Sequence, residues 1–248
     1  MSDCKIKSIP CDTDSFKHDY SQSPLLENKT LYQEIVGSLI YLMTGTRPDI
    51  SYVVTKLSEK MSNPTHAHLN IAKSVLRYLK GTIDKGICYT KVNEPISLSG
   101  YSDSDWGSSD DRKSMTAYCF KLSPNSSLVS WCSKKQQTVA LSTCESEYMA
   151  LSAAVQECMF LKQLLSSMSE NEVVPVCIHS DNKGTIDLAK NPVHHKRSKH
   201  IDIRHHFIRE HVKNGNVILK YIPSTENCAD LFTKAVPKCN LMKFNLIK

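Results

Sequence analysis

The stretch STCESEYMALSAAV, residues 142–155, is the part of this chain that decides its fold. Ser142 and Glu145 form the S-x-x-E pattern of a capping box, which marks a helix N-terminus and gives Glu145 a sufficient local task. Glu147 has no such task. Small residues follow it about one turn further along the helix and allow a close approach to a sheet, so we expect Glu147 to face inward.

Strands and helices are predicted on both sides of this helix. Before it, apolar runs separated by polar turns predict three strands joined as an antiparallel meander. After it, a short apolar run typical of a buried strand precedes two helices, a last strand and a last helix. This order predicts the α/β class, a mixed sheet with helices on its faces. The predicted strands are 96–103, 115–122, 128–132, 173–180 and 217–222, and the predicted helices are 142–165, 183–190, 199–213 and 224–235.

The residues upstream of the sheet have a different periodicity. Apolar residues at helical spacing predict three helices after residue 31. The second begins with Thr46 as a cap, Pro48 at its first position and Asp49 in its first turn. The predicted organisation is a flexible tail over 1–30, a helical segment over 31–92, a sheet domain over 93–236 and a C-terminal tail over 237–248.

The composition disfavours several classes of protein. No stretch of the 248 residues approaches the ~18 consecutive apolar residues of a membrane span. The start, MSDCKIKSIP, lacks the apolar core of a signal peptide, so we expect an intracellular protein that is not secreted. The ten cysteines include no C-x-x-C pair, which favours core thiols in a reducing compartment over a zinc site. The formal net charge of +6 fits a polyanionic partner.

Three aspartates accompany Glu147 as candidate site residues. Asp103 and Asp181 each end a predicted strand, and Asp230 lies within the last predicted helix. Each has an ordinary alternative: a turn at Asp103, a helix N-cap at Asp181 and a solvent-facing position at Asp230. Asp105 competes with Asp103. Acids in the order D…E…D…D are costly to bring together unless a cation lies between them, and hard cations such as Mg²⁺ prefer carboxylate oxygens.

The motifs around these acids, with two further motifs upstream, closely resemble a known family. Six of them resemble the ribonuclease H domain of copia-type LTR-retrotransposon polyproteins, and two resemble the end of the reverse transcriptase that precedes it. Together they cover about residues 31–236. The six are SGYSDSDWG, DDRKSMTAYCF, ESEYMAL, HSDNKG, KHIDIRHHFIRE and ADLFTKA, and the two are GSLIYLMTGTRPDISYVV and HLNIAKSVLRYLKGT.

This resemblance implies a fold and a site. The fold would be a ribonuclease H-like mixed five-stranded sheet with flanking helices, preceded by a small helical segment. Asp103 would be the shared ligand of two Mg²⁺ ions, for which Mn²⁺ can substitute. Glu147 and Asp181 would bind one ion and Asp230 the other. Cellular ribonucleases H carry a histidine in the loop before the last acid. This chain has YIPSTENCAD there, and His200, His205 and His206 are candidates by their position in the sequence.

The implied activity is magnesium-dependent endonucleolytic cleavage of the RNA strand of RNA–DNA hybrids. The partners would be the hybrid and the upstream reverse transcriptase region of the parent polyprotein, in the cytoplasm or a virus-like particle. The alternative is a catalytically silent, retrotransposon-derived fragment that binds nucleic acid. A transposase or integrase shares this fold type but usually has its glutamate last among three acids, and the early Glu147 disfavours that hypothesis.

Residues 190–213 are rich in basic side chains and histidines. The histidine spacing does not place a full ligand set on one helix face, and no cysteine lies nearby, which disfavours zinc. Phosphate binding is the favoured role, and a solvated helix face is the alternative. The candidate contacts are Lys196, Arg197, Lys199, Arg204 and Arg209.

Overall fold

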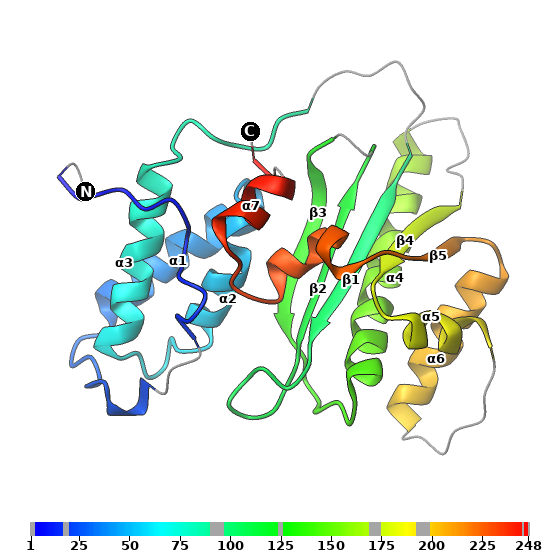
Figure 1. Cartoon of the computed structure of the whole chain (residues 1–248), viewed down its shortest axis with the longest axis horizontal. Coiled ribbons are helices and arrows are strands. Elements are labelled where there is room, and N and C mark those ends of the chain that lie inside the picture. Colours follow the sequence, from blue (N-terminus) through cyan, green and yellow to red (C-terminus); the bar gives the residue numbers. More distant parts are fainter. Residues whose placement is uncertain are drawn as a thin grey trace. The chain divides into compact units, whose positions relative to one another are not determined.

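A computed structural model describes residues 3–16, 20–89, 97–123, 126–168, 175–191, 199–244 and 246–247. The chain divides into two compact units. The helical unit comprises Met1–Cys88 with Lys234–Lys248, and the sheet unit comprises Tyr89–Thr233 (Figure 1). Among the described residues, no helix combines the length and the apolar composition needed to cross a membrane.

The sheet unit contains the mixed five-stranded sheet that the sequence predicts. Its strand order is β3-β2-β1-β4-β5, in which β1, β2 and β3 pair antiparallel and β4 and β5 continue parallel to β1. The meander and the crossover to a parallel strand confirm the predicted fold class. The strands are β1 Ser99–Asp105, β2 Met115–Lys121, β3 Leu128–Lys135, β4 Val176–Ser180 and β5 Val217–Tyr221.

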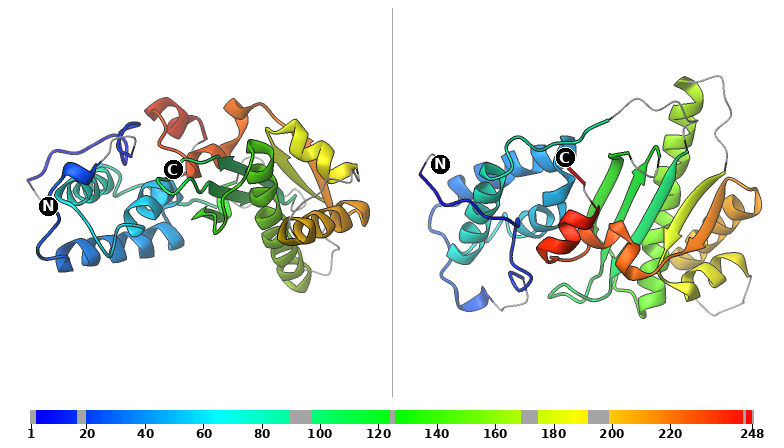
Figure 2. Two further views of the ribbon diagram at one scale, coloured as in Figure 1. Left: turned by 90° about the horizontal axis from the view of Figure 1, so that it is seen from below. Right: turned by 45° about the horizontal axis from the view of Figure 1, so that its top comes forward.

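Helix α4, Thr143–Met168, covers one face of the sheet, with α5, Lys183–Lys190, and α6, Lys199–Lys213, beside it (Figure 2). The bounds of α5 and α6 are those predicted from the sequence. The core between α4 and the sheet includes the fully buried Leu151 and Phe120. The Phe120 ring lies so close to Gly100 that a Cβ built there would be 2.4 Å from Phe120 Cε1, so β1 needs a glycine at this position.

The prediction of a last helix over residues 224–235 is wrong. Residues 224–235 form two short 3₁₀ segments instead, η3 Ser224–Glu226 and η4 Cys228–Phe232. The break is at Asn227, whose backbone is extended and whose buried side chain has other partners: Nδ2 donates to the Ser102 carbonyl at 2.9 Å, and Oδ1 accepts from the Ala229 N–H at 3.2 Å. The tertiary bond to Ser102 and the local bond that caps η4 favour an extended Asn227 over a continuous helix.

Helix η4 packs on the sheet face opposite α4. Successive residues of a strand point to opposite faces. Phe120 belongs to the core under α4, whereas Cys119 lies with its Sγ 3.0 Å from Cys228 Sγ of η4. Figure 1 shows η4, in orange, lying across β1 and β2.

The helical unit has its own core, which includes the fully buried Tyr32, Val36 and Leu39. Cys11 and Leu26 belong to this core too, although they lie within the stretch for which the sequence predicts a tail. Its elements are η1 Tyr20–Gln22, α1 Thr30–Gly45, η2 Pro48–Ile50, α2 Ser51–Ser58, α3 His66–Lys80 and α7 Lys238–Phe244.

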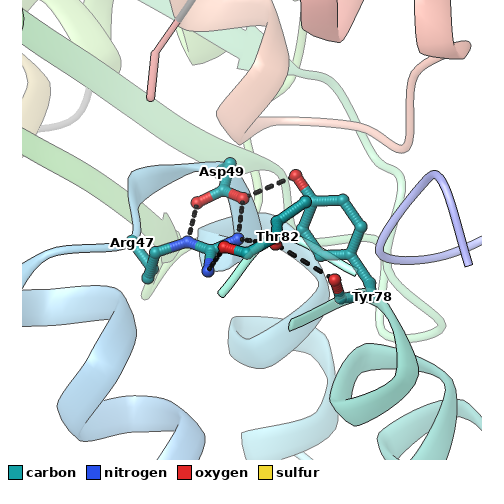
Figure 3. Close-up of polar contacts among 4 residues, drawn as sticks. All are labelled: Arg47, Asp49, Tyr78 and Thr82. Carbon is teal, nitrogen blue, oxygen red and sulfur yellow. Dashed lines mark hydrogen bonds and ion pairs between the residues drawn. The ribbon is translucent and has the colours of Figure 1, made fainter. Parts of the chain in front are cut away.

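The helical unit also buries an ion pair (Figure 3). Arg47 binds Asp49 through two hydrogen bonds, Nε to Oδ1 at 3.0 Å and Nη2 to Oδ2 at 2.8 Å. The Tyr78 hydroxyl donates to Asp49 Oδ2 at 2.7 Å, and the Thr82 hydroxyl accepts from Arg47 Nη2 at 2.7 Å. Burial and then the charge of Asp49 raise the pKa of Tyr78, so its hydroxyl stays protonated and donates.

Candidate metal centre

Asp103 lies near the C-terminal end of β1, two residues beyond Tyr101, the last residue of β1 that pairs with β4. The strand continues past it to Asp105, so Asp103 does not simply begin a turn. The Asp103 side chain is only 5% exposed. Of the two acids that the sequence leaves in competition, Asp103 is the one that the structure brings together with Glu147.

Glu147 lies in the first turns of α4 and is 5% exposed. Its Oε1 accepts a hydrogen bond from the Ser104 N–H at 3.1 Å, whereas its Oε2 is buried and has no hydrogen-bond partner. The local cap works much as the sequence predicts. The Ser142 hydroxyl accepts from the Glu145 N–H at 3.1 Å, and Glu145 reaches back to the Leu141 N–H at 3.0 Å. Glu145 is therefore occupied at the helix start, and Glu147 is left to face the sheet.

Asp181 directly follows β4, at the carboxyl end of a parallel strand, where open α/β sheets present ligand-binding groups. The alternative of a helix N-cap does not hold for it. Asn182 caps α5 instead, because its Oδ1 accepts from the Thr185 N–H at 2.9 Å. Asp181 is half-buried.

These three side chains converge. One carboxylate oxygen from each of Asp103, Glu147 and Asp181 lies within 4.8 Å of the other two. We call them the carboxylate group. Burial, followed by the charges of Asp103 and Asp181, raises the pKa of Glu147 well above its ordinary value. The buried Oε2 without a partner and a donor set made only of carboxylate oxygens fit a hard divalent cation.

Asp230, the fourth predicted acid, is half-buried on η4 and is not part of the carboxylate group at that distance. The segment that carries it is nevertheless attached to the group. The Thr233 hydroxyl lies 2.5 Å from Asp103 Oδ2 and 3.2 Å from the Asp230 carbonyl oxygen. Sequence reasoning missed Thr233. A threonine within the apolar run that follows Asp230 is the only signal that pointed to it.

The predicted nucleic-acid contacts divide between described and undescribed residues. Lys196 and Arg197 lie outside the described residues, as does the side chain of Lys199. Arg204 is half-buried on α6. Arg209 has a structural task, because its guanidinium donates to the Leu188 carbonyl, through Nη2 at 3.2 Å, and so attaches α6 to α5.

The candidate histidines divide in the same way. The side chains of His200 and His205 lie outside the described residues. His206 is exposed on α6. A role for any of these histidines at the carboxylate group stays a prediction from the sequence.

A cavity of about 480 Å³ lies within the helical unit. Its wall combines leucine and isoleucine side chains with basic ones and contains no carboxylate, so it has none of the chemistry of the carboxylate group. The residues that line it are Leu42, Thr46, Arg47, Leu79, Lys80, Ile83 and Lys85.

The chain is similar to part of several retrotransposon polyproteins. It is 42% identical over 223 residues to the retrovirus-related Pol polyprotein from transposon TNT 1-94 of Nicotiana tabacum, a match that covers 89% of this chain and 16% of that protein. It is 40% identical over 221 residues to the corresponding polyprotein from transposon RE2 of Arabidopsis thaliana, covering 89% and 15%. The chain thus spans about a sixth of the length of these relatives.

A shorter relative matches half of the chain. The secreted RxLR effector protein 161 of Plasmopara viticola is 48% identical over 131 residues, which cover 52% of this chain and 90% of that protein. No protein-family model matches the chain.

Two solved structures are similar to this chain. The foamy viral protease-reverse transcriptase, solved in complex with an RNA/DNA hybrid, superposes with a TM-score of 0.50 at 14% identity, covering 91% of this chain and 28% of that one. Ribonuclease H1 from the archaeon Halobacterium salinarum gives a TM-score of 0.41 at 12% identity, covering 55% and 93%. At these identities the likeness to the viral enzyme is one of fold.

Proposed function

The chain belongs to the copia-type retrotransposon Pol family, and from that premise we propose that it hydrolyses the RNA strand of RNA–DNA hybrids as a magnesium-dependent ribonuclease H. Its ribonuclease H-like fold and the carboxylate group support this proposal. The observation that carries it is the carboxylate group itself. Three acids from β1, α4 and the end of β4 meet within 4.8 Å, although each repels the others.

The residues present fit Mg²⁺, which takes oxygen ligands and usually keeps several waters. Asp103, Glu147 and Asp181 would hold one ion, and Asp230, from η4, would contribute to a second that shares Asp103. Mn²⁺, with similar ligand preferences, would substitute. The chemistry that a pair of such ions would supply there is activation of a water and stabilisation of the leaving oxygen of a phosphodiester.

The chain's own residues prepare this chemistry in two ways. The Ser104 N–H holds Glu147 Oε1 at 3.1 Å and leaves the buried Oε2 for a ligand. Close packing of α4 on β1 keeps the three acids together, so the cost of gathering like charges is met during folding and not during the reaction. Cleavage in this manner leaves a 5′-phosphate on the product.

The family and the charge of the chain support the proposed substrate class. Three negative side chains alone repel a nucleic-acid backbone, whereas the whole chain has a formal net charge of +6. The basic residues of α6 and of the stretch before it supply phosphate contacts in this proposal, and groove shape together with 2′-hydroxyl contacts selects the hybrid. The foamy viral relative is solved with an RNA/DNA hybrid, which supports the same class here. The upstream reverse transcriptase region is the proposed protein partner, in the cytoplasm or a virus-like particle.

Cleavage of a labelled RNA–DNA hybrid by the purified full chain tests the proposal. Wild-type chain with Mg²⁺ is expected to cut the RNA strand, and EDTA is expected to stop it. Asp103→Asn removes a member of the carboxylate group, and Asp187→Asn, an exposed aspartate on α5, is the matched control. Loss of cleavage in the first variant alone supports the site. Equal cleavage by both variants overturns it.

One observation favours a second function, binding of the hybrid without cleavage. Asp230 is not part of the carboxylate group at 4.8 Å, so the second ion has fewer ligands in place than the first. Hybrid binding by the wild-type chain in a gel-shift assay, without any cleavage in Mg²⁺ or Mn²⁺, would establish this function in place of the first.

A further inference from the structure

We propose that Thr233 is a positioning residue that fixes the Asp103 carboxylate for the metal site and couples it to η4. The inference rests on the proposed function, because it concerns the same site. It deepens that proposal by naming a neutral side chain on which the alignment of the acids depends.

The geometry of the Thr233 hydroxyl identifies its acceptor. A hydroxyl has one hydrogen, and two oxygens compete for it: Asp103 Oδ2 at 2.5 Å and the Asp230 carbonyl at 3.2 Å. Hydrogen bonds from a hydroxyl to an ionised carboxylate are short, about 2.5–2.7 Å, and roughly twice as strong as neutral ones. The hydrogen therefore goes to Asp103.

Burial makes this bond persistent. Thr233 is 0% exposed and Asp103 is 5% exposed, so water does not readily replace either partner. A bond to one oxygen restricts rotation of the carboxylate about its last side-chain torsion. Asp103 is then held in the orientation in which an oxygen lies within 4.8 Å of Glu147 and Asp181.

Thr233 is itself held in place by the anchoring of η4. The Asn227 side chain donates to the Ser102 carbonyl at 2.9 Å, and the Ser133 hydroxyl donates to the Phe232 carbonyl at 2.6 Å. Both bonds end on backbone carbonyls. The bond from Thr233, by contrast, ends on a member of the carboxylate group, so Thr233 transmits the position of η4, and hence of Asp230, to Asp103.

The test compares Thr233→Ala with Thr233→Ser in the full chain. Both variants lose the threonine methyl group, and they differ only in the hydroxyl. Titration of Mn²⁺ by calorimetry is expected to show about tenfold weaker affinity for Thr233→Ala than for Thr233→Ser, since a hydrogen bond to a charged group is lost. In the hybrid-cleavage assay the kcat should fall with KM for the hybrid unchanged. Thr82→Ala, which removes a buried hydroxyl from the helical unit, should leave the Mn²⁺ affinity at its wild-type value.

A purely structural role for Thr233 predicts a different pattern. It would lower the unfolding midpoint in EDTA and leave the Mn²⁺ affinity of the folded chain unchanged, and that result overturns the proposal. If Thr233→Ala does not fold, Thr233→Val, which keeps the shape, replaces it against Thr233→Ser with the same expected loss. Wild-type chain that binds no Mn²⁺ overturns the proposed function and this inference together. Mn²⁺ binding by the wild type that Thr233→Ala matches overturns this inference alone.

Discussion

In the helical unit Asp49 is surrounded by groups that neutralise its charge, whereas in the sheet unit Glu147 faces two further acids that repel it. The side chains of Asp49 and Arg47 are 1% and 7% exposed, and Arg47 and Tyr78 bind both carboxylate oxygens of Asp49. Glu147 is just as buried, yet the neighbours that raise its pKa are two further acids, and its Oε2 has no partner. Two buried carboxylates of the same chain thus have neighbours of opposite charge.

The difference separates a structural acid from a functional one. A buried charge with a complete set of partners holds two segments together, and its loss leaves the opposite charge buried alone. Buried charges that face each other destabilise the fold until a ligand of opposite charge binds, so they are retained only where that ligand matters. Burial alone therefore does not identify a site; the sign of the neighbouring charges does.

The largest expected effect is on activity. Glu147→Gln should lower cleavage of an RNA–DNA hybrid by about 10³-fold, because a metal ion contributes several kcal/mol to stabilising the transition state. The same variant in EDTA should not be less stable than the wild type, since it removes a repelled charge. If the Glu147→Gln variant cleaves the hybrid normally, or if it unfolds, Glu147 is not a functional acid.

The next effect is on stability. Asp49→Asn should lower the free energy of unfolding by about 3–5 kcal/mol, because the Arg47 guanidinium stays buried without its counter-charge. Asp12→Asn, which breaks an exposed pair with Lys7, should cost less than about 1 kcal/mol. Urea unfolding followed by far-ultraviolet circular dichroism measures both. Equal values for the two variants would show that Asp49 is not a structural acid.

The addition of a metal should affect the two units differently. Mg²⁺ at about 100 times its Kd should stabilise the sheet unit by about 2.7 kcal/mol. The two tryptophans, Trp106 and Trp131, both lie in the sheet unit, so tryptophan fluorescence reports its unfolding specifically. Glu147→Gln should remove this stabilisation by Mg²⁺, and Asp49→Asn should keep it. If Mg²⁺ still stabilises the sheet unit of Glu147→Gln, the ion binds elsewhere.

The smallest expected effect is on pH dependence. Glu147 has a raised pKa in the folded state, so the folded chain binds more protons than the unfolded one above the ordinary value of about 4.5. The metal-free sheet unit should therefore lose stability as pH rises from 4.5 through the raised pKa, by at most about 1.4 kcal/mol per pH unit. Fluorescence-monitored unfolding of Glu147→Gln in EDTA should give a flatter profile than the wild type. Identical profiles would contradict the assignment of the titration to Glu147.

The sequence predicts what local patterns determine. The helix 199–213 and the inward position of Glu147 follow from periodicity and from the capping task of Glu145, and the structure has both. The motif around Asp49 predicts the acidic first turn of a helix, and that local pattern contains no information about Tyr78, 29 positions away in the sequence.

The C-terminal segment of the sheet unit is a second case in which distant contacts decide the structure and local sequence patterns do not reveal them. Apolar residues around Asp230 predict a helix, but Asn227 binds Ser102, 125 positions away, and the segment folds as short 3₁₀ turns. The bond from Thr233 to Asp103 spans 130 positions. Neither contact leaves a periodic signal in the sequence, because a single tertiary hydrogen bond imposes no spacing on the neighbouring residues.

A crystal structure of the full chain grown with Mn²⁺ tests the central claim most directly, because the anomalous signal of manganese locates the ion without reference to activity. The account predicts an anomalous peak bound by oxygens of Asp103, Glu147 and Asp181. Manganese bound elsewhere, or the three carboxylates turned away from one another with no peak between them, would contradict it.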